Sequence, residues 1–300
     1  MALLLRLAPL QSSYRAAAAP APLPVARFRP LPPLLCHPGG KSKSKGVILP
    51  RIPPHRVYVE PFFGGGSVFF GKPPAAKSVL NDIDRPLMNF YRRLDCARLR
   101  RCVAGMVAIA KARDSEKLRS AWWRRANRMA AGSSESCDVF IGKTYGYGCK
   151  SGRPSFAPST AMRGNDNRKG GATKVKRCPE YKERLRNATI LSQDYQAVMR
   201  RFDGRDTFFY LDPPWLGVGK NQEDNGQYYR GKATTSPETV CSFLRKVKGK
   251  FLLHYDDNPR IQQACRGFQI ERVPWATSMY DTGGKKKHAL LISNFKTKAR

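Results

Sequence analysis

The chain has 300 residues, of which 55 are lysine or arginine and 22 are aspartate or glutamate, giving a formal net charge of +33. A basic surplus of this size indicates a polyanionic partner and makes an acidic small substrate unnecessary as an explanation. The length suffices for one α/β domain with an inserted or appended recognition subdomain. No run of 18 apolar residues is present, so we expect no membrane span.

The N-terminal leader, residues 1–36, contains four arginines, many Ala, Leu and Pro residues, and no acidic residue. This composition is typical of an organellar transit peptide. Arg6 interrupts the only apolar run there, which argues against a secretory signal. We therefore expect an intracellular protein imported into a mitochondrion or plastid. A disordered basic leader or a misassigned start, with the protein in the nucleus or cytoplasm, is the alternative.

A short strand followed by a glycine turn is predicted at residues 57–70. The apolar run that ends at Glu60 leads into Pro61, Phe62 and the three glycines at 64–66, and an apolar stretch suited to a helix follows. Glycines in such a turn let the backbone approach a ligand closely and adopt positive φ. By itself the turn is a weak signal, because it does not match the dinucleotide-binding pattern.

A second strand, at residues 78–84, ends in acidic residues. Asp82 lies 22 positions after Glu60. An acid at this distance, at the end of the second strand, is suited to bind a ribose diol in nucleotide-binding α/β folds. Asp84 is the alternative ribose ligand, or it caps the helix that follows.

The middle of the chain is strongly basic. Residues 99–131 are helical by composition, and basic residues are dense over 113–128 and 143–186, with aromatic residues interleaved. The polar segments 150–154 and 163–171 are typical of flexible loops. The pattern favours a nucleic-acid-binding surface, with a solvated basic face as the plainer explanation.

Three further strands are predicted near residues 187–193, 207–211 and 251–255. The second is an apolar run that ends in Asp212-Pro213-Pro214-Trp215. The two prolines donate no backbone hydrogen bond, so their carbonyls and the Asp212 carboxylate form an acceptor-only edge beside an aromatic face. Such an edge suits the exocyclic amine of a nucleobase. Together with the glycine turn and the ribose acid, it describes an S-adenosylmethionine pocket beside an amine-methylation site. Residues 216–236 are predicted to form a mobile loop next to it.

Eight cysteines occur without a CxxC pair, and the four histidines are not placed to complete a zinc site. We therefore expect reduced thiols and no bound metal.

The motifs together resemble the Dam-type (D12 class) DNA adenine-N6 methyltransferases over residues 37–297. Besides EPFFGGGSVFF and DPPW, the similarity covers residues 39–41, 52–55, 87–91, 141–148 and 282–291. The glycine turn precedes DPPW, which is the order of the DNA-acting group, whereas messenger-RNA adenosine methyltransferases have the opposite order. Two positions depart from the family: His37 stands where Trp is usual, and Trp215 where Tyr is commoner.

The resemblance implies a Rossmann-like fold, with a doubly wound, mainly parallel sheet and an inserted helical and loop region for DNA target recognition. The expected domains are a catalytic domain at 37–98 and 187–297 and a recognition insertion at 99–186. It also implies S-adenosylmethionine as cofactor, Lys41 facing its methionine carboxylate and Asp82 its ribose. The full cofactor set is His37, Gly39, Gly40, Lys41, Glu60, Pro61, Phe62, Gly64, Gly66, Asp82 and Asp212, although Glu60 can instead be structural.

The implied activity is methyl transfer to adenine N6 in double-stranded DNA, after the base is rotated out of the helix into the pocket. Asp212, Pro213, Pro214 and Trp215 are the expected catalytic residues, and the protein is expected to act as a monomer without metal. The expected DNA-binding residues are Lys143, Tyr145, Tyr147, Lys150, Arg153, Lys285 and Lys286. A non-catalytic DNA-binding relative, or a methyltransferase for cytosine N4 or RNA, are the alternatives.

Overall fold

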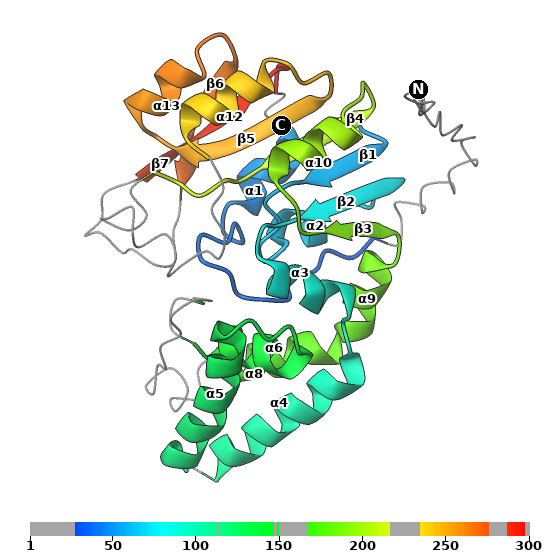
Figure 1. Ribbon diagram of the computed structural model, residues 1–300, viewed down its shortest axis with the longest axis vertical. Helices are drawn as coiled ribbons and strands as arrows, with labels where there is room; N and C mark the ends of the chain where they lie inside the picture. The colour runs from blue at the N-terminus through cyan, green and yellow to red at the C-terminus, as the bar shows by residue number, and fades with distance from the viewer. Residues whose placement is uncertain are drawn as a thin grey trace, which may run out of the picture.

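The computed structural model describes residues 28–112, 114–146, 149, 167–216, 235–275 and 287–297, with only the backbone of 167–170 and 287 (Figure 1). Most of the leader and most of the loop predicted at 216–236 therefore lie outside the described residues. Within these ranges, no helix is both long enough and apolar enough to cross a membrane.

A seven-stranded sheet in the order β3-β2-β1-β4-β5-β7-β6 forms the centre of the fold. Strands β1 to β5 run parallel, and β7 is antiparallel to both β5 and β6. This mainly parallel sheet confirms the predicted Rossmann-like fold. The strands are β1 (Val57–Glu60), β2 (Lys77–Asn81), β3 (Ala188–Leu191), β4 (Thr207–Leu211), β5 (Lys250–Asp256), β6 (Gln269–Trp275) and β7 (Lys287–Ser293).

Both faces of the sheet are buried, which explains why its central strands are continuous apolar runs. Every residue of β4 is buried; Phe208 and Tyr210 point into one core, and Phe209 and Leu211 into the other. The first core also contains residues of α1 (Lys45–Ile48), α2 (Ser67–Gly71) and α3 (Arg85–Arg92). The second contains residues of α10 (Tyr195–Phe202), α12 (Pro237–Leu244) and α13 (Pro259–Ala264). A 3-10 turn, η2 (Leu49–Arg51), follows α1.

A group of helices separates α3 from β3 in the sequence and lies at one end of the molecule, below the sheet in Figure 1. Carboxylates of Asp95, Asp114 and Glu135 accept backbone N–H groups at the starts of the first three helices. The group comprises α4 (Cys96–Lys111), α5 (Ser115–Ala130), α6 (Ser136–Tyr145), α8 (Asn167–Lys176) and α9 (Cys178–Leu185). The predicted helical region at 99–131 is thus two helices, and the predicted insertion boundary at 99 falls inside α4.

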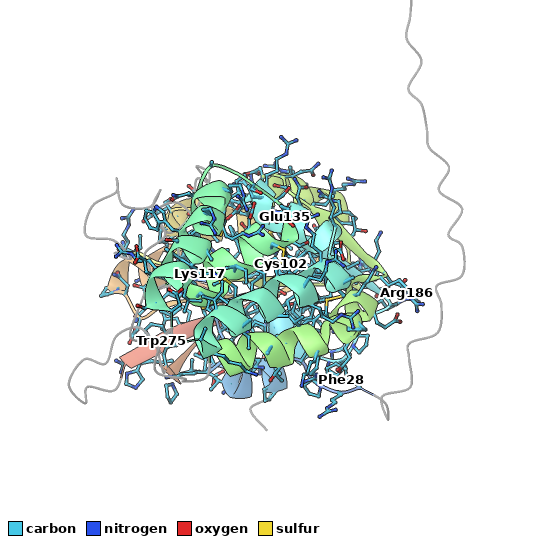
Figure 2. The ribbon with its side chains drawn as sticks, turned by 90° about the horizontal axis from the view of Figure 1, so that it is seen from below. Phe28, Cys102, Lys117, Glu135, Arg186 and Trp275 are labelled. Carbon is cyan, nitrogen blue, oxygen red and sulfur yellow. A yellow bond between two sulfur atoms is a disulfide. The ribbon has the colours of Figure 1, made fainter. Side chains whose placement is uncertain are left out.

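The underside of this helical group carries many basic side chains around its rim, as Figure 2 shows. Lys117 on α5 lies on this side and is exposed, and Arg124 on α5 and Arg100 on α4 are exposed as well. Trp122, on α5, is fully buried, and α5 packs against α6. Whether the insertion recognises DNA stays a prediction.

All eight cysteines are paired, so the expectation of reduced thiols is wrong. The paired Cα atoms lie 5.3 to 5.9 Å apart, within the range that a disulfide spans. The partners are 24 to 113 positions apart in the sequence. Packing of distant helices, which spacing along the chain does not reveal, brings them together. The pairs are Cys36–Cys149, Cys96–Cys178, Cys102–Cys137 and Cys241–Cys265.

Candidate active site

Three acidic residues of the predicted site lie at the carboxyl ends of three adjacent parallel strands. Strand β1 lies between β2 and β4, so Glu60, Asp82 and Asp212 reach the same edge of the sheet. The Asn81 side chain connects the loops at this edge: its amide donates to the Pro61 and Gln193 carbonyls, both at 3.0 Å. Sequence-distant motifs therefore meet at one place.

The glycine turn packs directly against the N-terminal arm, which we define as residues 31–44. Gly64 and Gly66 have φ of +49° and +69°, a backbone conformation that favours glycine. A Cβ at Gly64 would lie 2.8 Å from the His37 ring, and one at Gly65 would lie 2.8 Å from the Leu35 carbonyl oxygen. The turn thus needs glycine both for its conformation and for the close approach of the arm.

Asp82 and Asp84 have different roles in the structure. The Asp82 carboxylate accepts the backbone N–H groups of Gly64 and Asp84, at 2.9 and 3.0 Å. Burial is the largest influence on Asp82 and raises its pKa to about 6. Asp84 accepts the Leu87 N–H at 3.2 Å and caps α3, which is the capping role given above as one alternative for Asp84.

The arm also reaches the catalytic strand through a buried ion pair. Lys41 Nζ lies 2.6 Å from Asp212 Oδ2 and donates to the Gly39 carbonyl at 2.7 Å. The Lys41 side chain is only 6% exposed, so it is not part of a solvated basic run. Burial raises the pKa of Asp212, and the Lys41 charge opposes that rise. Lys41 thereby favours the ionised carboxylate.

Trp215 lies between groups from three other segments. Its ring centroid is 4.6 Å from that of Trp275 and 5.2 Å from that of His254, which meets it edge-on at 87°. Lys41 Nζ is 4.8 Å from the same ring. Pro213, just before, is buried and Pro214 half-buried. The aromatic face expected next to Asp212 is therefore present, and it is held in a defined position.

His254 and Trp275 were not among the predicted site residues. His254 could have been predicted from the sequence, because it lies in the strand expected after the catalytic one. Parallel pairing of Leu211 with Leu253 places it beside Asp212. Trp275 could not have been predicted, since no sequence pattern indicated strand β6.

Two buried polar atoms face each other at the centre of the site. Asp212 Oδ1 and His254 Nδ1 are 4.0 Å apart, and neither has a hydrogen-bond partner among the described residues. Burial, followed by the Lys41 charge, lowers the pKa of His254 well below its usual value, so its imidazole is neutral. Asp212 Oδ1 is thus an acceptor open to a donor from outside the protein.

Glu60, a predicted cofactor ligand, faces the protein interior. Its carboxylate is 3% exposed and accepts the Tyr58 hydroxyl at 2.7 Å. Burial raises the pKa of Glu60 to about 8, so the carboxyl group is largely protonated at neutral pH. These contacts favour the structural alternative for Glu60, and a cofactor contact stays a prediction.

Replacing Glu60 with glutamine is expected to change how stability depends on pH. A folded-state pKa of about 8, above the unfolded value, means that the wild type loses stability as pH rises from about 4.5 through 8. Glutamine keeps an acceptor for the Tyr58 hydroxyl and carries no charge, so the variant should not show this loss. Urea unfolding at pH 5.5 and 8.5 measures it. Glu183→Gln, on the surface of α9, is the control, and equal pH slopes for Glu60→Gln and wild type would contradict the prediction.

The predicted DNA-binding residues are only partly described. Lys143 and Tyr145 lie on α6 and are buried, at 1% and 4% exposure. Lys143 Nζ donates to the Cys149 carbonyl at 3.3 Å, and its charge contributes to lowering the pKa of His37. Both side chains would have to become exposed to touch DNA, and that role stays a prediction. Tyr147, Lys150, Arg153, Lys285 and Lys286 lie outside the described residues.

Comparison with known proteins gives the same assignment as the motifs. The model of the D12 class N6 adenine-specific DNA methyltransferases matches residues 37–119 and 160–279. The type II methyltransferase M.MjaIII of Methanocaldococcus jannaschii is 24% identical over 295 residues, which cover 88% of this chain and 99% of the relative. Since the family model matches more than half of its length, the chain belongs to the D12 class N6 adenine-specific DNA methyltransferase family.

Proposed function

We propose that the protein transfers a methyl group from S-adenosylmethionine to N6 of an adenine that has been rotated out of double-stranded DNA. The observation that carries this proposal is Asp212 Oδ1, a buried atom to which no described residue donates at full hydrogen-bond geometry, although the nearby Trp215 side chain helps to lower the pKa of the carboxyl group. A primary amine on a flat aromatic ring suits such a site, because the amine can donate a hydrogen bond to Oδ1 and the ring can stack on Trp215.

The residues at the sheet edge fit the proposed cofactor. S-adenosylmethionine, when bound, supplies a methyl group that is already activated on a sulfonium sulfur. The glycine turn gives close backbone approach, and each Asp82 oxygen has a lone pair left for a ribose hydroxyl. Exposed Ile83, next to Asp82, offers an apolar surface to the purine. Lys41 uses two of its three N–H donors on Gly39 and Asp212, which leaves one for the methionine carboxylate.

The flipped base would be held by the tetrapeptide Asp212-Pro213-Pro214-Trp215. Rotating adenine out of the duplex costs roughly a few kcal/mol, and stacking on an aromatic side chain recovers about 1–3 kcal/mol. Asp212 Oδ1 accepts one N6 hydrogen and the Pro213 carbonyl the other, which turns the nitrogen lone pair toward the methyl group. Lys41, on Oδ2, keeps the carboxylate ionised during this contact. Positioning and local electrostatics then provide most of the rate enhancement.

The product nucleoside tests this proposal. The full chain is incubated with DNA and methyl-labelled cofactor, and the DNA is digested and analysed by mass spectrometry. We expect N6-methyladenine. Label found only at cytosine N4, or only when RNA is supplied, would contradict the adenine assignment, and absence of label with DNA binding retained would indicate a non-catalytic relative.

Cofactor affinity is expected to fall in acid because of Asp82. Ribose hydroxyls donate to an ionised carboxylate, and the pKa of Asp82 is raised to about 6 by burial. Below that pH the protonated fraction grows, so the Kd should rise by about tenfold per pH unit. Calorimetric titration with S-adenosylhomocysteine between pH 5 and 8 measures this. Asp82→Asn should bind weakly at every pH, whereas Asp84→Asn, which keeps the helix cap and removes only a charge, should keep the pH dependence. A flat wild-type profile would exclude Asp82 as the ribose ligand.

A further inference from the structure

The disulfide between Cys36 and Cys149 differs from the other three in its exposure. Cys36 is exposed and Cys149 is half-buried. Each of the other three disulfides contains at least one cysteine that is essentially inaccessible: Cys178, Cys137, and both members of Cys241–Cys265. Cys96 and Cys102 are half-buried, and Cys36 is the one exposed cysteine of the eight. A thiol reagent must reach a sulfur atom to attack it, so Cys36–Cys149 is the disulfide most open to reaction in the folded protein.

This disulfide joins the arm to the helical insertion. Its cysteines are 113 positions apart, with Cα atoms 5.5 Å from each other, and Cys149 follows α6. The insertion therefore holds the arm by a covalent bond at a point where the arm turns toward the sheet edge.

Both ends of the bond lie next to residues of the candidate active site. On the arm, Cys36 precedes His37, whose ring lies over Gly64, and Lys41, which pairs with Asp212. On the insertion, the Cys149 carbonyl accepts Lys143 Nζ, and the Lys143 charge acts on both His37 and Asp82. Breaking the bond would loosen the segment that positions these groups.

We propose that Cys36–Cys149 is a reversible thiol–disulfide site that reacts with a dithiol or a low-molecular-weight thiol, and that its oxidised form favours cofactor binding. The effect on cofactor affinity rests on the proposed function, whereas the reactivity of the disulfide does not.

The reaction balances as an ordinary thiol–disulfide exchange. A thiolate of the reductant attacks Cys36 Sγ, the sulfur–sulfur bond breaks, and Cys149 leaves as a thiolate that takes up a proton. The second thiol of the reductant then displaces Cys36 from the mixed disulfide. Two electrons and two protons have passed to the protein, and the reductant has become a disulfide. A small disulfide reverses the sequence.

Reduction should weaken cofactor binding without unfolding the protein. The arm remains attached on either side of the broken bond: the Leu31 N–H donates to the Phe70 carbonyl, the Tyr181 hydroxyl donates to the Pro32 carbonyl, and Lys41 contacts Asp212. Leu34 and Leu35 also stay buried in the core, so only the segment around Cys36 becomes free. Because binding must then order that segment again, we expect the Kd to rise by roughly five- to tenfold.

Thiol mapping tests the reactive site by itself. The full chain, purified without reductant, is treated under native conditions with increasing dithiothreitol, alkylated, and analysed by peptide mass spectrometry. Cys36 and Cys149 should be labelled first, while the other six cysteines require denaturation. Earlier labelling of another pair, or labelling of Cys36 and Cys149 without any reductant, would overturn the proposal.

Cofactor titration tests the coupling. S-adenosylhomocysteine should bind more weakly to the reduced protein and to Cys36→Ser and Cys149→Ser, and the reductant should have no further effect on these two variants. The double variant Cys241→Ala/Cys265→Ala, altered on the opposite face, should respond to reductant as the wild type does. A Kd that changes less than twofold on reduction would overturn the coupling. If the oxidised wild type binds no cofactor, the proposed function fails, and the order of thiol labelling still decides whether the site exists.

Discussion

Replacement of Asp212 with alanine is expected to lower kcat for DNA methylation by about 10²–10³-fold, the usual effect of removing one preorganised electrostatic contact. The substitution removes the acceptor Oδ1 that the target amine would use, and it leaves buried Lys41 without its carboxylate partner. Asp212→Asn should retain more activity, because its carbonyl oxygen still accepts one hydrogen bond. Labelled methyl transfer gives kcat, and fluorescence anisotropy with a DNA duplex gives the binding affinity.

The matched control for this prediction is at the other end of the same strand. Asp206 is exposed and directly precedes β4, so Asp206→Asn should methylate DNA like the wild type. Near-normal kcat in Asp212→Ala would contradict the proposed chemistry. Loss of DNA binding together with activity would instead assign Asp212 to folding or docking.

The sequence predicts best those strands that are buried on both faces of the sheet. Strand β4 was predicted with its observed bounds, 207–211, because every residue in it is apolar or follows a turn, and all are buried. Strand β1 is similar: Tyr58, Val59 and Glu60 are buried and Val57 is half-buried, and only Glu60 is not apolar or aromatic. The acid after such a strand reaches the carboxyl edge by parallel pairing alone. That the glycine turn and Asp212 reach the same edge of the sheet was implied by the family resemblance, because local patterns do not give the order of the strands.

Strand β6 could not be predicted, and with it the position of Trp275. Among the described strands it is an edge strand that pairs only with β7, and of its seven residues only Val273 is buried. Its sequence, with Pro274 near the end, lacks both the apolar run of a buried strand and a regular alternation. The contact of Trp275 with Trp215 depends on this strand, and so it becomes visible only in three dimensions.

The cysteine pairing was beyond sequence reasoning for a different reason. Eight cysteines allow roughly a hundred pairings, and no spacing motif selects among them. The packing of α4 against α6 brings Cys102 next to Cys137, and the return of the chain at α9 brings Cys178 next to Cys96. These contacts arise only once the helical insertion has folded.

Removal of the Cys96–Cys178 disulfide should lower stability more than removal of Cys241–Cys265. Cys96 is the first residue of α4 and Cys178 the first of α9, so the bond closes the helical insertion at its base across 82 positions. Closing a loop of that length in the unfolded chain corresponds to about 4.5 kcal/mol in the chain-entropy description. We expect Cys96→Ala/Cys178→Ala to lose most of this free energy of unfolding, measured by urea denaturation without reductant.

The double variant Cys241→Ala/Cys265→Ala is the comparison that isolates loop length. Its disulfide spans 24 positions, for which the same description gives about 1 kcal/mol less. Cys178, Cys241 and Cys265 are fully buried and Cys96 is half-buried, so substitution removes at least as much packing at Cys241–Cys265 as at Cys96–Cys178. A larger loss for Cys96–Cys178 would therefore reflect the longer loop. Equal losses, or the reverse order, would contradict the loop-length explanation and show that local packing determines how much each disulfide stabilises the fold.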